Sequence, residues 1–392
     1  MKYTFDQIIN RRGTHSFKWD SGDLLVKMGF TERFDEDTLP LFLADMDFAC
    51  PNPVLDALHA RVDEKIFGYT NHLSDHRYMD ALTGWFKRRH GWKINPESVV
   101  YSPGTVYALH VAIRAFTKPG DKIIIQRPVY ASFTTAIEDN NRVVANNELL
   151  NDNGYYHINF EELEKLASDS STTMMILCSP HNPVGRIWTP QELKEIDRVC
   201  RKHGVILVSD EIHGDLIRKE AVFYPIATVV PTDNTIICTA INKTFNTAGL
   251  HCSNIILDNP TLQKAFQKKC VLQSPSPFAI SALIAAYNEG EEWLEQLKTY
   301  LDGNFDLLEA FLKESLSKVQ FKRPEGTYFA WLDFSKTGLS PEEIHHRIYT
   351  QANILLEDGK IFGEKSIFFQ RMCLPTPRNL LIKALERLGE VF

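Results

Sequence analysis

Four short apolar runs, each followed directly by polar residues, constrain the fold of this chain more than any other feature. They are Lys122–Gln126, Met174–Cys178, Val205–Val208 and Thr235–Thr239. Runs of this length and composition are typical of buried strands, and helical segments such as Pro190–His203 lie between some of them. Apolar strands that alternate with helices predict an α/β fold, with a mostly parallel sheet covered by helices on both faces.

Each predicted strand leads to a polar side chain just beyond its end. Tyr130, Asn182, Asp210 and Lys243 follow the four runs in that order. Because the ends of parallel strands open onto one crevice, we expect the four side chains to lie together there. Taken singly, each also fits an ordinary structural role, as a core aromatic, a turn asparagine, a capping aspartate or a surface lysine.

The turn Ser102–Thr105 adds a possible anion site. It contains Gly104 and leads into a helix, so its free N–H groups and the positive end of the helix dipole suit a phosphate. A lysine can form a Schiff base, an aspartate can hold a cationic ring nitrogen, and an aromatic ring can stack on a flat ligand. A phosphorylated pyridine aldehyde, pyridoxal 5′-phosphate (PLP), uses all of these groups.

Composition narrows the remaining function classes. The net charge of −7 offers no basic field for nucleic acid or an anionic membrane. Seven scattered cysteines without a C-x-x-C pair favour a reducing compartment, and no apolar run reaches the length of a membrane span. We therefore expect a cytoplasmic protein that binds neither nucleic acid nor membrane. We also expect no metal site, since His72 and His76 have no third ligand nearby.

The length of 392 residues suggests two or three domains. Residues 1–50 are predicted to form an N-terminal arm or small-domain segment, and residues 51–288 a large domain that holds the ligand. Residues 289–392 are predicted to form a small α+β domain. A strongly helical stretch, Ile280–Leu316, could run from one domain into the next. After it, strands are predicted at Gln320–Asp333 and Ser366–Leu374, and helices at Pro341–Ala352 and Arg378–Leu388.

Ten short stretches carry a family resemblance and span nearly the whole chain. They are RRGTHSFKWD (11–20), LFLADMDF (41–48), FGYT (67–70), SPGTVYAL (102–109), RPVYASF (127–133), SPHNPVGRIW (179–188), SDEIHGDL (209–216), NKTFNTAGL (242–250), EGTYFAWLD (325–333) and RMCLPTPR (371–378). In these stretches the sequence resembles the fold-type I PLP enzymes of the class I/II aminotransferase superfamily. Within that superfamily it is similar to the MalY/PatB group of cystathionine β-lyases, or C–S lyases.

The resemblance implies an aspartate-aminotransferase-like fold with a seven-stranded sheet. It also implies a homodimer with shared active sites, and α,β-elimination on cystathionine or other S-substituted cysteines. Pyruvate, ammonia and a thiol would be the products. An aminotransferase and a PLP-binding regulatory protein without turnover remain as alternatives, because no single residue separates elimination from transamination.

The resemblance also implies roles for individual residues. Lys243 would form the Schiff base and move the Cα proton, Asp210 would pair with the ring nitrogen, and Tyr130 would stack on the ring. The other implied cofactor contacts are Gly104, Thr105, Asn182, His213, Asn242 and, from the neighbouring subunit, Tyr69. His213 stands where many relatives have a tyrosine, and Asn242 where the group commonly has a serine. Arg378 would clamp the substrate carboxylate, Asn182 would also contact the substrate, and Asp45 either caps a helix or borders the substrate site.

Overall fold

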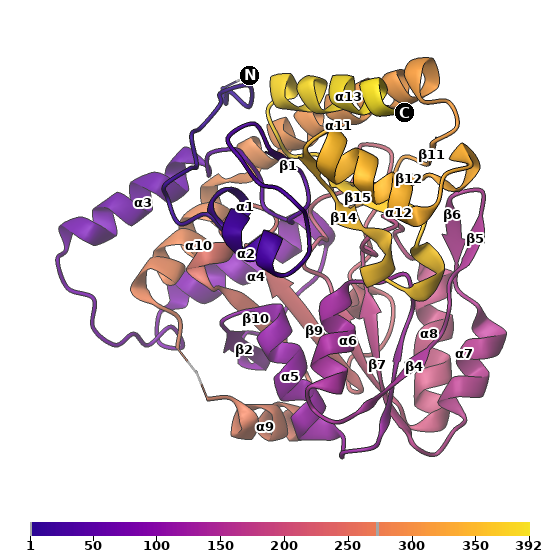
Figure 1. The fold of residues 1–392 in the computed structure, drawn as a ribbon. Helices are drawn as coiled ribbons and strands as arrows, with labels where there is room; N and C mark the ends of the chain where they lie inside the picture. Colours follow the sequence, from indigo (N-terminus) through magenta and orange to yellow (C-terminus); the bar gives the residue numbers. More distant parts are fainter. Residues whose placement is uncertain (1, 272–273) are drawn as a thin grey trace.

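The computed structural model describes residues 2–271 and 274–392 (Figure 1). Its main sheet has seven strands in the order β2-β10-β9-β8-β7-β3-β4. These strands are β2 (Val99–Ser102), β3 (Lys122–Ile125), β4 (Val143–Asn146), β7 (Thr172–Cys178), β8 (Ile206–Asp210), β9 (Thr235–Ala240) and β10 (Ser253–Ile256). β10 runs antiparallel to both of its neighbours, β2 and β9, and the remaining neighbouring pairs are parallel. The predicted mostly parallel sheet is confirmed, and the four apolar runs are β3, β7, β8 and β9.

Helices cover both faces of this sheet. Alternate side chains of β7 enter two separate cores, Met175 on one face and Met174 on the other. The helices around the sheet are α3 (Asn52–Asp63), α4 (His76–His90), α5 (Thr105–Phe116), α6 (Ala131–Glu138), α7 (Phe160–Ala167), α8 (Pro190–His203), α9 (Pro260–Lys269) and α10 (Pro277–Glu289). The sequence marks the ends of α8 clearly, with a Thr189–Glu192 capping box before it and Gly204 in the left-handed region after it.

A smaller sheet forms a second layer with its own core. Its order is β11-β12-β15-β14, from β11 (Gln320–Phe321), β12 (Phe329–Asp333), β14 (Glu357–Asp358) and β15 (Phe369–Cys373). The helices α11 (Glu291–Ser315), α12 (Pro341–His345) and α13 (Arg378–Val391) belong to this part, and a π-helix, His346–Gln351, follows α12. The smaller α+β unit is therefore present, while the domain boundaries at residues 50 and 288 stay predictions.

The N-terminal part is joined to this second unit. Its strand β1 (Leu39–Pro40) pairs in parallel with β13 (Ile354–Leu355), and two short helices, α1 (Phe17–Asp20) and α2 (Gly22–Lys27), precede it. In Figure 1 this indigo segment lies beside the yellow C-terminal part. Residues 1–50 were predicted only as an arm or small-domain segment, with no helix or strand assigned, so these short elements are new in the structure. They are too short to leave a periodic pattern.

The predicted helical stretch Ile280–Leu316 is two helices rather than one. The break falls at Gly290, between α10 and α11. A Cβ atom at Gly290 would lie 2.5 Å from the carbonyl oxygen of Ala286 and 2.6 Å from the ring of Phe245. The chain therefore turns where only glycine leaves enough room. In residues 2–271 and 274–392, every helix is too short or too polar to span a bilayer.

Candidate active site

The ends of three central strands lie level with one another. Cys178 of β7 is paired with Asp210 of β8, and Asp210 is paired with Cys238 of β9. The chain leaves β9 after Ala240 and reaches Lys243 three residues later. This register brings the residues that follow the strands to one edge of the sheet, as expected for an α/β fold.

A cavity of about 180 Å³ lies at this edge. Eight residues predicted from the strand ends, the glycine turn or the family resemblance line it. They are Gly104, Thr105, Tyr130, Asn182, Asp210, His213, Asn242 and Lys243. Ala44 and His251 also line the cavity and were not predicted. The structure thus brings together one lysine, one carboxyl group, one aromatic ring and one helix N-terminus.

Lys243 has the features of a reactive amine. Its Nζ donates a hydrogen bond to the carbonyl oxygen of Ala44 at 2.8 Å. Burial lowers the pKa of this amine, and the positive charge of Arg371 acts in the same direction. A lower pKa increases the fraction of neutral amine near pH 7. Only the neutral amine can attack a carbonyl carbon or take a proton.

Asp210 lies buried at the end of β8. Its Oδ1 accepts the backbone N–H of Ile212 at 3.3 Å. Burial raises the pKa of this carboxyl group to about 7, although the nearby Lys243 opposes the shift. A buried carboxylate is costly without a positive partner. A protonated ring nitrogen in the cavity would supply that partner.

Two further buried atoms at the cavity have no hydrogen-bond partner among the described residues. They are Nδ1 of His213 and Oδ1 of Asn242. Buried polar atoms are normally satisfied, so these two atoms suit a polar ligand. At another side of the cavity, Gly104 caps α5, whose first N–H groups have no acceptor within the helix. The residues present therefore fit PLP, with its phosphate at α5 and its ring near Asp210.

Three predicted residues do not line this cavity. Tyr69 is fully exposed. Asp45 forms an ion pair with Arg11, with 2.6 Å between Oδ2 and Nη2. Arg378 begins α13, where its guanidinium group lies 4.6 Å from the ring centre of Tyr300. Their predicted contacts with cofactor or substrate remain predictions.

The sequence analysis missed Arg371, which is buried in β15. Its Nη1 donates to Oδ1 of Asn182 at 2.9 Å, and its Nη2 donates to the carbonyl oxygen of Phe42 at 2.9 Å. Glu357 is its ion-pair partner, and burial lowers the pKa of the guanidinium group to about 10. A signal was present in the sequence, because an arginine inside an apolar strand is rare unless it is paired or functional.

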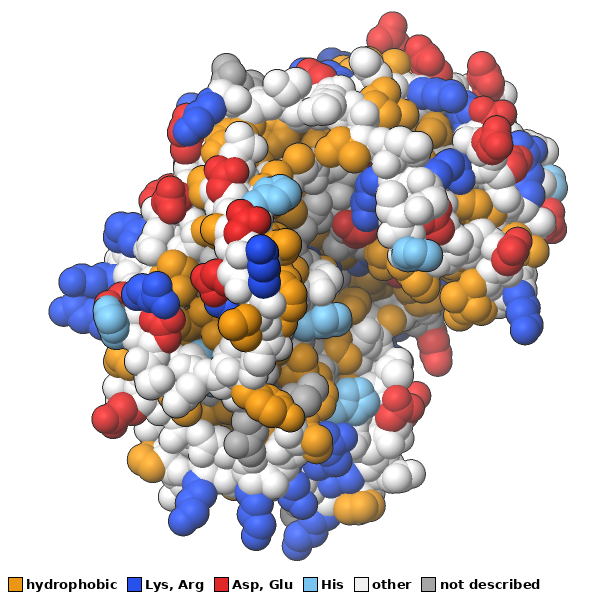
Figure 2. All heavy atoms as spheres, turned by 90° about the vertical axis from the view of Figure 1, so that its left-hand side faces the viewer, with side chains coloured by type: hydrophobic (Ala, Val, Ile, Leu, Met, Phe, Trp, Pro, Cys, Tyr) orange, Lys and Arg blue, Asp and Glu red, His pale blue; other side chains and the backbone are white. Residues whose placement is uncertain are grey.

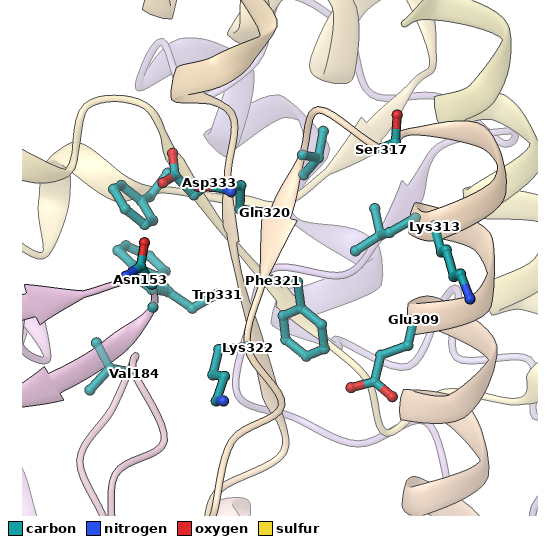
Figure 3. A pocket seen from close by; sticks show the side chains of 14 residues that line it. Asn153, Val184, Glu309, Lys313, Ser317, Gln320, Phe321, Lys322, Trp331 and Asp333 are labelled. Carbon is teal, nitrogen blue, oxygen red and sulfur yellow. The ribbon is translucent and has the colours of Figure 1, made fainter.

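A larger cavity lies elsewhere, between α11, the β11 and β12 strands, and the turn that joins β5 (Leu150–Asp152) to β6 (Tyr155–His157). Its volume is about 380 Å³, and none of the predicted site residues lines it. Figure 3 shows charged side chains of both signs around it, including Glu309, Lys313 and Lys322. Nor does the described part of the chain contain a cluster of three residues suited to a metal ion. The smaller cavity at the strand ends is therefore the candidate active site.

Comparisons with known proteins agree with this geometry. The family model "Aminotransferase class I and II" matches residues 40–388. The chain is 42% identical to cystathionine beta-lyase PatB of Bacillus subtilis over 94% of each chain, and 30% identical to protein MalY of Escherichia coli over 98% of each. It also superposes on the PLP-containing crystal structure of cystalysin from Treponema denticola, with a TM-score of 0.95 and 34% identity over 100% of this chain and 99% of that one.

These matches extend over nearly the whole chain and include every strand end that lines the cavity. The resemblance predicted from short motifs is therefore confirmed at the level of the family and its PLP dependence. On the family model and these relatives, this chain belongs to the PLP-dependent class I and II aminotransferase family.

Proposed function

We propose that the chain is a PLP-dependent carbon–sulfur β-lyase that acts on L-cystathionine or related S-substituted L-cysteines. It would release pyruvate, ammonia and a thiol, which is homocysteine when cystathionine is the substrate. The observation that carries the proposal is the meeting of Lys243, Asp210 and Asn182 at one cavity. The choice of a lyase is supported by the 42% identity to a named cystathionine β-lyase.

The chemistry divides between the cofactor and the chain. Bound PLP supplies an electron sink for the pair of electrons left when the Cα proton departs. Lys243 would hold PLP and, as a free neutral amine, would take the Cα proton. Asp210 would keep the proton on the ring nitrogen, so that the ring can accept electrons. Tyr130 would stack on the ring, and Asn182, His213 and Asn242 would hold its polar edge.

We also propose that Arg371, rather than Arg378, binds the substrate carboxylate. Arg371 contacts Asn182, which lines the cavity, and the positive charge of Arg371 helps to lower the pKa of Lys243. Arg378 instead donates to Oδ1 of Asn304 at 3.3 Å and stacks on Tyr300. A guanidinium group binds a carboxylate through two parallel hydrogen bonds, which fixes the substrate in one orientation.

A homodimer would complete the site. Several large apolar side chains are exposed in the segment after α3, among them Ile66, Phe67, Tyr69 and Leu73. Figure 2 shows the face that carries α3, where exposed apolar side chains surround a hollow. Exposed apolar patches of this kind are typical of protein interfaces. We propose that a second copy covers this face and that Tyr69 reaches the phosphate site of that copy.

Mixing two inactive variants tests this shared site. Tyr69→Ala and Lys243→Ala would each damage every site in their own dimers. In a mixed dimer, one site carries both changes and the other carries neither. Random exchange would then restore about a quarter of the wild-type activity. Failure to restore activity, while mixed dimers form by mass spectrometry, would contradict a shared site.

An aminotransferase is the second candidate, since the family model includes that activity. Incubation of the PLP-loaded protein with L-cystathionine and no keto acid separates the two. Sustained release of pyruvate and homocysteine supports the lyase, whereas a single turnover that stops supports the aminotransferase. No reaction at all would favour a PLP-binding protein without turnover. A cytoplasmic location is also proposed, because all seven cysteines are free thiols and six of them are buried.

A further inference from the structure

Residues 41–48, called the bridging segment here, provide hydrogen-bond acceptors for both cations near the cavity. The carbonyl oxygen of Phe42 accepts Nη2 of Arg371 at 2.9 Å. The carbonyl oxygen of Ala44 accepts Nζ of Lys243 at 2.8 Å. Arg371 belongs to the smaller sheet, whereas Lys243 follows a strand of the large one. Two carbonyl groups only two residues apart therefore connect cations from two different parts of the fold.

Asn246 attaches the bridging segment to the loop that carries Lys243. Its Oδ1 accepts the backbone N–H of Met46 at 3.1 Å, and its Nδ2 donates to the carbonyl oxygens of Met46 and Phe48 at 3.0 and 2.9 Å. Asn246 has a positive φ of 57°, a conformation that asparagine tolerates better than most residues. Three hydrogen bonds from one side chain thus hold the segment at a fixed distance from the lysine loop.

A buried ion cluster holds the same segment from the N-terminal side. Nζ of Lys18 lies 2.7 Å from Oδ2 of Asp47, and these side chains are only 0% and 4% exposed. Nη1 of Arg11 and Nε1 of Trp19 both donate to Oδ1 of Asp47, at 3.0 and 2.8 Å. Buried ion pairs add little net stability, because removing the charges from water is costly. Such a cluster does hold its side chains in one geometry, which suits a segment with a fixed position.

We propose that the bridging segment sets the position of Lys243 relative to Arg371, and that Asn246 is a positioning residue for proton transfer by Lys243. The proposal rests on the proposed function only in that Lys243 moves a Cα proton. The free amine of Lys243 is the form that takes this proton, and Ala44 is its acceptor in the structure. A misplacement of about 1 Å in such a step can reduce the rate by about 100-fold.

The test compares Asn246→Gly with a matched control, Asn141→Gly. Glycine keeps the positive φ and removes only the side chain. Asn141 has a similar φ of 59° at an exposed position, where its backbone forms hydrogen bonds with Glu138 and Gly120. The assay follows exchange of the Cα hydrogen of L-alanine into D2O by NMR, with PLP-loaded protein. Because L-alanine carries no thiol leaving group, the assay reports proton transfer and not elimination. We expect Asn246→Gly to slow exchange about 10- to 100-fold per bound PLP, and Asn141→Gly to change it less than about twofold.

Backbone amide exchange provides a second measurement. Asn246→Gly should speed the exchange of the Met46 amide, which loses its acceptor. Asn246→Asp keeps that acceptor but loses both donated bonds, so it should fall between wild type and Asn246→Gly. If Asn246→Gly does not fold, Asn246→Asp tests the proposal in its place.

Faster amide exchange with an unchanged Cα exchange rate per bound PLP would overturn the proposal. A Cα exchange rate that falls only in proportion to the amount of bound PLP would also overturn the proposal. Wild-type protein that exchanges the Cα hydrogen but releases no pyruvate from cystathionine would contradict the lyase assignment alone.

Discussion

The two sides of the candidate active site are built in different ways. The sheet side consists of residues at the ends of regular strands or a few positions beyond them, namely Asn182, Asp210 and Lys243. The opposite side consists of the bridging segment and Arg371, held by contacts between residues far apart in the sequence. Strand register thus places the groups proposed to hold the cofactor, while long-range contacts place the groups proposed to position substrate and base. Substitutions on the two sides should therefore affect different kinetic constants.

The largest effect is expected on the sheet side, for Lys243→Ala. In the proposed mechanism, this variant lacks both the attachment point for PLP and the base for the Cα proton. General base catalysis alone contributes about 10²- to 10⁴-fold, so the rate of pyruvate release should fall by at least about 10³-fold. Steady-state assays of the PLP-loaded protein measure this loss. A variant that keeps one tenth of the wild-type rate would remove Lys243 from the mechanism.

Asp210→Asn should reduce activity and yet stabilise the protein that lacks PLP. Burial raises the pKa of the folded carboxyl group to about 7, well above its unfolded value. As the pH rises from about 4 to 7, the unfolded chain loses this proton first, so the wild type loses stability over that range. Asparagine has no proton to lose. At pH 8 the cofactor-free variant should be more stable by about 4 kcal/mol, with little difference at pH 4.

Urea denaturation of both cofactor-free proteins at the two pH values checks this effect, and PLP-loaded samples serve as the control. Equal stabilities at pH 8 would show that Asp210 ionises without cost and is not in an apolar site. The result would then weaken its role as partner of the ring nitrogen.

A smaller and different effect is expected on the opposite side, for Arg371→Gln. Loss of a charged hydrogen bond to the substrate carboxylate costs about 1.5–3 kcal/mol, so KM for cystathionine should rise about 10- to 100-fold. Arg378→Gln is the matched control and should change KM by less than about threefold. The reverse pattern would assign the carboxylate to Arg378, as the sequence analysis predicted.

The sheet side could be predicted because its rule is local. Apolar runs mark the strands, and the ends of parallel strands meet at one edge, so Asp210 and Lys243 were placed without any long-range information. The break at Gly290 shows the limit of such reasoning, since it depends both on the nearby carbonyl oxygen of Ala286 and on the ring of Phe245, which is distant in the sequence.

The opposite side follows no such rule. Arg371 contacts Asn182 across 189 positions of sequence, and Lys243 contacts Ala44 across 199. The short stretch 371–378 contains two arginines, and only the packing of β15 shows which one lies near the cavity. Asp45 poses the same problem, because it forms an ion pair with Arg11. What Tyr69 contacts would depend on the proposed second subunit.

The most direct test of the central claim is to identify the lysine that binds PLP. The PLP-loaded protein is treated with borohydride, which makes the bond between cofactor and lysine permanent, and is then digested and analysed by mass spectrometry. The account predicts that the cofactor is found on Lys243, in a peptide that spans the end of β9. Cofactor on another lysine, or on none, would contradict it.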